Sequence, residues 1–104
     1  MDQIFLEEAA EMLKVMGHPL RIKIAQCLEP GALNVGEISQ AIGAAQAATS
    51  QHLKAMRVRG LLEARREGAC VYYHIARPEV YKIIHCIREG AQPASGNPEG
   101  AGAV

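Results

Sequence analysis

The stretch VGEISQAIGAAQAATSQHLKAMRVRGLL, residues 35–62, predicts two short helices joined by a tight turn. Gly43 stands at the turn, where glycine adopts the left-handed conformation that ends a helix. The apolar or inward positions recur at helical spacing and are Val35, Ile38 and Ile42 in the first helix and Thr49, Leu53 and Met56 in the second. This arrangement is typical of a helix-turn-helix, whose second helix enters the major groove of DNA.

The other faces of the second helix carry groups that could contact DNA. Amide, hydroxyl and ammonium groups reach base edges or phosphates, and the candidates are Gln46, Ser50, Gln51 and Lys54. Arg57 and Arg59 follow and could hold phosphates. Because any solvated helix carries such residues, this segment alone leaves a DNA-reading helix and an ordinary surface helix equally open.

The next segment, LLEARREGACVYYHIA at residues 61–76, favours the DNA-reading interpretation. Two runs of alternating β-type sequence flank Glu67-Gly68-Ala69, which predicts a hairpin. Arg65 and Arg66 lie near its tip. A hairpin directly after a reading helix is the wing of a winged helix.

Composition indicates one soluble domain with an aliphatic core. The chain has 104 residues, 49% of them apolar, with one Phe, three Tyr and no Trp. A chain of this size is near the lower limit for a self-sufficient core, so we expect a partner subunit. No run approaches the length of a membrane span and no cleavable leader opens the sequence, so a cytoplasmic protein is expected.

Charge is unevenly distributed although the net charge is zero. Residues 41–77 carry six Lys and Arg against two Glu, a net charge of +4, whereas residues 1–40 carry −3. The positive excess therefore falls on the predicted reading helix and wing, where phosphates would be met. Chance clustering on a solvated face is the alternative.

Helices are expected on both sides of this region. Residues 3–16 and 19–29 show helical spacing of apolar residues; Gly17 ends the first helix and Pro19 lies in the first turn of the second. A last helix opens at Pro78, and its apolar seam consists of Val80, Ile83, Ile84 and Ile87. Such a seam predicts a dimer contact. We expect residues 1–90 to form the winged helix-turn-helix DNA-binding and dimerisation domain, and residues 91–104 to be a disordered tail.

At these residues the sequence resembles the ArsR/SmtB family of dimeric bacterial repressors. The phrases that carry the resemblance are GHPLRIKIAQCL, VGEIS, TSQHLKAMRVRGLLEARREG and VYYHI, within residues 6–88. The resemblance implies a mainly helical winged helix with the order α-α-α-α-β-β-α and a homodimer through the first and last helices. It also implies that the dimer binds a palindromic double-stranded DNA operator and leaves it when an inducer binds.

The resemblance also implies roles for individual side chains in DNA binding. The implied base contacts are Gln46, Ala47, Ser50 and Gln51, the implied backbone contacts are His52 and Lys54, and the wing contacts are Arg65 and Arg66. Ala44-Ala45 departs from the Leu-Ser pair common in the family. Because Ala45 cannot cap the reading helix through its side chain, about 1 kcal/mol of local stability is lost.

The two common metal sites of the family are not matched, and no cofactor is expected. Asn34, Val35 and Gly36 stand where a Cys-x-Cys pair would be. Arg77, Glu79 and Gly90 stand at the positions of a His-carboxylate zinc site.

Cysteines are the remaining candidates for sensing an inducer. Cys27 on the second helix and Cys86 on the last resemble the dithiol subgroup, in which the two thiols are joined after reaction with persulfide or oxidant, although the register is imperfect. Taken alone, Cys27 is better explained as a core residue than as a sensor, and Cys70 on the wing is expected to be incidental. An alternative metal site for arsenite, Cd²⁺ or Cu(I) would use Cys27, His85 and Cys86.

The sequence therefore predicts a DNA-binding, homodimeric repressor that an inducer releases by acting on cysteine thiols. The first alternative is the same repressor with a soft-metal inducer. Two further alternatives are a winged helix that contacts only proteins and a thiol enzyme that uses Cys86 with His85. An enzyme is not expected, because the side chains of adjacent residues on one helix point in different directions.

Overall fold

The computed structural model describes residues 2–90, which form helices and a small sheet in the order of a winged helix. The elements are α1 (Gln3–Met16), α2 (Pro19–Leu28), β1 (Leu33–Asn34), α3 (Val35–Ile42), α4 (Gln46–Val58), β2 (Leu62–Glu67), β3 (Cys70–Ile75) and α5 (Pro78–Gly90). The mainly helical winged helix-turn-helix is confirmed. The predicted tail at 91–104 lies outside the described residues.

Helix boundaries follow local capping chemistry. The side chain of His18 accepts a hydrogen bond from the backbone N–H of Leu20 and begins α2, with Pro19 as the first helical residue. Asn34 and Glu37 form a reciprocal capping box at the start of α3. Gly43 ends α3 with φ of 70°, the left-handed conformation expected there.

The three strands form an antiparallel sheet in the order β1-β3-β2. The predicted hairpin is confirmed, with Leu62 paired to Ile75 and Ala64 paired to Tyr73. The short strand β1 was not predicted from the sequence; Leu33 pairs with Tyr73 and Asn34 with Tyr72. This strand ties the start of α3 to the wing, so the helix-turn-helix and the wing form one unit.

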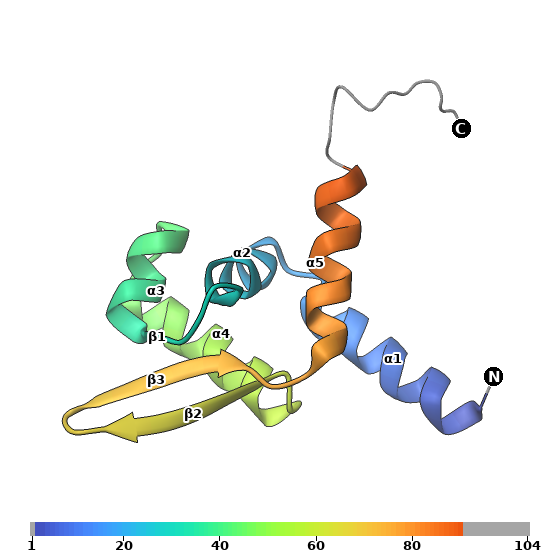
Figure 1. The fold of residues 1–104 in the computed structure, drawn as a ribbon, viewed down its shortest axis with the longest axis horizontal. Helices are drawn as coiled ribbons and strands as arrows, with labels where there is room; N and C mark the ends of the chain where they lie inside the picture. The colour runs from blue at the N-terminus through green and yellow to red at the C-terminus, as the bar shows by residue number, and fades with distance from the viewer. Residues whose placement is uncertain (1, 91–104) are drawn as a thin grey trace.

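The core is centred on α2, which packs against α1, α3, α4, α5 and β3. Ile24, Ala25 and Leu28 of α2 are almost completely buried. In Figure 1 the wing extends to one side of this core and α1 extends to the other, with α5 standing across the structure between them. The helix-turn-helix and the wing therefore occupy one end of the molecule. Within the described residues, no helix is both long and apolar enough to cross a membrane.

Candidate nucleic-acid interface

Helix α4 presents a polar face to solvent because its apolar face is buried. Thr49, Leu53 and Met56 are buried, as predicted, and the Thr49 hydroxyl donates to the carbonyl of Ala45 at 2.8 Å. The predicted base and phosphate contacts Gln46, Ala47, Ser50, Gln51, Lys54 and Arg57 are all exposed. Their exposure leaves them available to DNA.

The first turn of α4 lacks a side-chain cap. Ala45 occupies the N-cap position with extended backbone, and within the described residues no side-chain hydrogen bond caps the helix. This confirms that Ala45 takes the capping position without performing the capping role. The N–H groups of the first turn are left for solvent or a ligand.

His52 differs from the other predicted contacts because it points toward α2. Arg21 Nε donates to His52 Nδ1 at 3.1 Å, and the His18 ring lies 4.5 Å from the His52 ring, centroid to centroid. Burial lowers the pKa of His52, and the nearby His18 and Arg21 lower it further. The neutral imidazole joins the reading helix to α2, while its contact with a DNA backbone stays a prediction.

The two wing arginines lie on opposite faces of the hairpin because side chains alternate along a strand. Arg65 is adjacent to Glu67 on its own face, with Nε 2.9 Å from the carboxylate. Arg66 forms no ion pair within residues 2–90. The structure therefore distinguishes two residues that the sequence treats alike.

The positive charge of Arg59 is also partly neutralised by a carboxylate. Its guanidinium lies 3.2 Å from the carboxylate of Glu11 on α1, with both side chains exposed. The sequence offered Arg59 as a phosphate contact without indicating this partner.

The wing and the reading helix share a groove of about 440 Å³. Ser50 of α4 lies on one side and Ala69, Cys70 and Val71 of the wing lie on the other, with the start of α3 between them. Cys70, predicted to be incidental, is exposed here. The side chain of Ser50 and the wing tip are thus brought together, which sequence spacing could not indicate.

The cysteines of α2 and α5 have different environments. Cys27 is half-buried, its thiol lies 3.2 Å from the carbonyl of Ile24, and burial raises its pKa. Cys86 is exposed. An ion pair between Glu29 and Arg88 joins the two helices two residues after each cysteine.

The alternative soft-metal site is not assembled within one chain. In the described part of the chain, no group of three or more His, Cys, Asp or Glu side chains is arranged to hold a metal ion. Cys27 packs toward its own helix backbone, whereas His85 and Cys86 are exposed neighbours that project in different directions. The set Cys27, His85 and Cys86 therefore stays a prediction, and these side chains would have to rearrange to bind a metal ion together.

Comparison with known proteins identifies the family. Residues 18–64 match the family described as "Bacterial regulatory protein, arsR family". The transcriptional repressor PagR of Bacillus anthracis is 45% identical over 80 residues, which are 76% of this chain and 80% of PagR. The crystal structure of PagR has a TM-score of 0.75 at 40% identity and covers 83% of this chain and 99% of that one.

Two further solved structures share the fold at comparable identity. Reduced HlyU from Vibrio cholerae has a TM-score of 0.79 at 33% identity, covering 86% of this chain and 96% of that one. The homodimeric winged helix-turn-helix DNA-binding domain of Mb0332 from Mycobacterium bovis has a TM-score of 0.74 at 32% identity, covering 85% and 82%. Because of the matched family, the repressor relatives and the shared fold, we conclude that this chain belongs to the ArsR family and is a winged-helix, DNA-binding transcriptional repressor.

Proposed function

We propose that the protein is a homodimer that binds a palindromic operator through α4 and the wing, and that chemistry on Cys27 and Cys86 releases it. The observation that carries the dimer is the apolar surface of α1. Its exposed apolar side chains are Ile4, Phe5, Leu6 and Leu13, with exposed fractions between 45% and 64%. Exposed apolar side chains concentrated on one helix support a contact with another protein surface.

Helix α5 continues the same surface. Ile87 is exposed, whereas Val80 and Ile84 of the predicted seam are buried in the protein's own core. A mostly apolar recess of about 220 Å³ lies between α1 and α5, bounded by Phe5, Leu13 and Ile83. A second copy would fill this recess and cover α1. The homodimeric state of the Mb0332 domain supports the same arrangement here.

A two-fold symmetric dimer would require a palindromic operator. Two copies related by a two-fold axis present two α4 helices in opposite orientations, so half-sites of a DNA duplex must be inverted repeats. The exposed Gln51 and Ser50 would read base edges, and Arg66 at the wing would reach the backbone or minor groove.

The DNA part of the proposal is tested with Gln51→Ala. We expect the variant to lose about 1–3 kcal/mol of discrimination between the operator in the protein's own upstream region and a scrambled duplex. Fluorescence anisotropy on both duplexes measures this. Gln26→Ala, an exposed glutamine on α2, is the matched control. Retained discrimination by Gln51→Ala would refute base reading by α4.

The inducer part of the proposal rests on the packing of α2 against α5. The exposed Cys86 thiolate would attack the outer sulfur of an alkyl persulfide, RSSH, and the alkyl thiolate RS⁻ would leave. The Cys27 thiolate would then attack the sulfur attached to Cys86, forming an S–S bond and releasing HS⁻. Cys27 acts second because burial raises its pKa and lowers the thiolate fraction.

A bond between α2 and α5 would reach the reading helix through α2. Arg21 of α2 holds His52 of α4, so displacement of α2 is transmitted to α4 and changes the spacing of the two reading helices. DNA affinity would fall while the fold persists.

Cysteine substitutions test this step. Cys27→Ser and Cys86→Ser should bind the operator normally and remain bound after a persulfide donor is added, whereas Cys70→Ser should be released like the wild type. Mass spectrometry of the wild type should show the loss of two hydrogens, reversed by reductant. Normal release of both Cys27→Ser and Cys86→Ser would refute the thiol switch, and release by Cd²⁺ or arsenite alone would favour the soft-metal alternative.

A further inference from the structure

A second cationic surface lies beside the reading helix, and two of its four cations, Lys14 and Arg21, come from the N-terminal segment whose net charge is −3. A groove of about 590 Å³ separates the C-terminal half of α1 and the start of α2 from α4. The charged and polar residues that line it are Glu11, Lys14, Arg21, Gln51, Lys54 and Arg59. Four of these are cations and one is an anion.

Most of these charges already have partners. The Glu11 carboxylate is 3.2 Å from Arg59. Arg21 donates from Nε to His52 and from one terminal nitrogen to the carbonyl of Val15 at 3.2 Å. Lys14 and Lys54 form no ion pair with any residue in the described range 2–90. Two free ammonium groups therefore line the groove, with no anion left to neutralise them.

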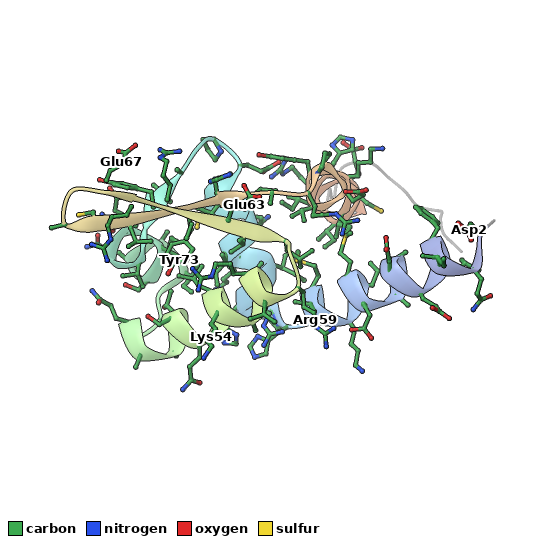
Figure 2. All side chains as sticks on the ribbon, turned by 90° about the horizontal axis from the view of Figure 1, so that it is seen from below. Asp2, Lys54, Arg59, Glu63, Glu67 and Tyr73 are labelled. Atoms are coloured by element: carbon green, nitrogen blue, oxygen red, sulfur yellow. The ribbon has the colours of Figure 1, made fainter. Side chains whose placement is uncertain are left out.

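The groove faces the same side as the base-reading residues. Gln51 and Lys54 lie on the exposed face of α4, and both line the groove. Figure 2 shows Lys54 and Arg59 along the edge of the molecule formed by α4 and α1. DNA contacted by Gln51 would pass directly over this opening.

We propose that the groove is a phosphate-binding site in which Lys14 of α1 and Lys54 of α4 contact the operator backbone next to the base read by Gln51. This inference rests on the proposed DNA reading by α4. Lysine ammonium groups hold phosphates as point charges without reading sequence. Lys14 therefore supplies affinity and salt dependence, and it extends the interface from the reading helix onto α1.

Sequence inspection alone does not reveal this site. Lys14 lies in the segment of residues 1–40, whose net charge is −3, and 40 residues separate it from Lys54. Folding pairs Glu11 with Arg59 and places Lys14 opposite α4. The positive charge at the groove is thus created by the tertiary structure.

Lys14→Gln tests the proposal in the full-length protein. If each protomer loses one phosphate contact, the slope of log Kd against log salt should fall by about 1.8 per dimer. Affinity should fall by the same factor for the operator and for a scrambled duplex, because no base contact is lost. Lys14→Arg should restore the slope. Lys23→Gln, an exposed lysine on α2 outside the groove, is the control.

Two contrary outcomes are distinguishable. If Lys14→Gln keeps the wild-type slope while Gln51→Ala loses operator discrimination, the groove does not contact phosphate and α4 still reads DNA. If neither variant differs from the wild type, both the groove and the reading by α4 are refuted.

Discussion

The two ends of the molecule differ in how far their apolar side chains are buried. At the reading end, Ile38, Leu53 and Met56 are completely buried and the polar residues of α4 face solvent. At the other end, Leu13 of α1 is 57% exposed, and Ile4 and Phe5 are exposed as well. The reading end is complete within one chain, whereas the α1 end is completed by a second copy under the proposed function.

This difference is what the proposed function requires of its two binding surfaces. A helix whose apolar face is buried within its own chain leaves polar groups for a partner, as α4 would for DNA under that proposal. A helix that keeps apolar residues exposed offers hydrophobic area, as α1 would for a second copy. Arg21 connects the two ends, because it donates hydrogen bonds to His52 of α4 and to the carbonyl of Val15 on α1.

Equivalent leucine substitutions at the two ends should have the largest and most clearly different effects. Leu53 is fully buried, so Leu53→Ala should lower the free energy of unfolding by about 2–5 kcal/mol at every protein concentration. Leu13→Ala should destabilise only where the dimer is populated, because the contact it removes belongs to the partner. Urea unfolding at low and high protein concentration measures both. An equal, concentration-independent loss for Leu13→Ala would contradict the dimer surface.

The wing arginines should differ in their effect on salt dependence. Arg66→Gln removes an unpaired charge, so the salt slope of DNA binding should fall by about 1.8 per dimer. The double variant Arg65→Gln/Glu67→Gln removes one charge of each sign from a 2.9 Å pair and should leave the slope close to that of the wild type. Anisotropy titrations between low and moderate salt provide the measurement. A reduced slope in the double variant would show that Arg65 leaves Glu67 to contact DNA.

Ala45→Ser should raise the free energy of unfolding by about 1 kcal/mol. A serine hydroxyl at the N-cap can accept a hydrogen bond from a backbone N–H of the first turn of α4, which Ala45 cannot do. Thermal unfolding should show a higher Tm. Ala41→Ser places the same residue at an exposed position inside α3, where about 0.5 kcal/mol is lost by helix propensity. A lower Tm in Ala45→Ser would contradict the capping argument.

The smallest expected effect is a change in pH dependence at the junction between the two ends. Because the pKa of His52 in the folded protein is lower than the ordinary value of 6.5, the unfolded chain takes up a proton first as the pH falls. The contribution of neutral His52 to the stability of the folded protein is therefore complete above about pH 6.5 and is lost progressively below it. In His52→Asn this loss should disappear, and unfolding measured between pH 5 and 8 should vary less. An unchanged pH profile would assign the dependence to another group.

Local patterns in the sequence predicted most of the fold. Helical spacing located α3 and α4, Gly43 marked the turn between them, and β-type alternation located the two strands of the wing. These features depend on residues a few positions apart, so they can be read along the chain. Strand β1 was missed because two residues carry no periodicity, and its pairing with β3 joins residues about 40 positions apart.

Sequence also identified the candidate DNA contacts, but it could not separate their environments. It gave the exposed polar face of α4 and the two wing arginines, because amphipathic spacing decides which side of a helix is solvated. It could not show that His52 turns to Arg21, or that Cys27 is half-buried while Cys86 is exposed. Each of these depends on a neighbour that folding supplies.

The sequence by itself determined the winged-helix class, the family and the position of the reading helix, since these follow from periodicity, turn residues and short motifs. Only the tertiary structure decided which charges are free and which apolar residues stay exposed. The physical reason is that electrostatic pairing and burial depend on distances between side chains, and Lys14 approaches Lys54 across a groove although 40 residues separate them in the chain.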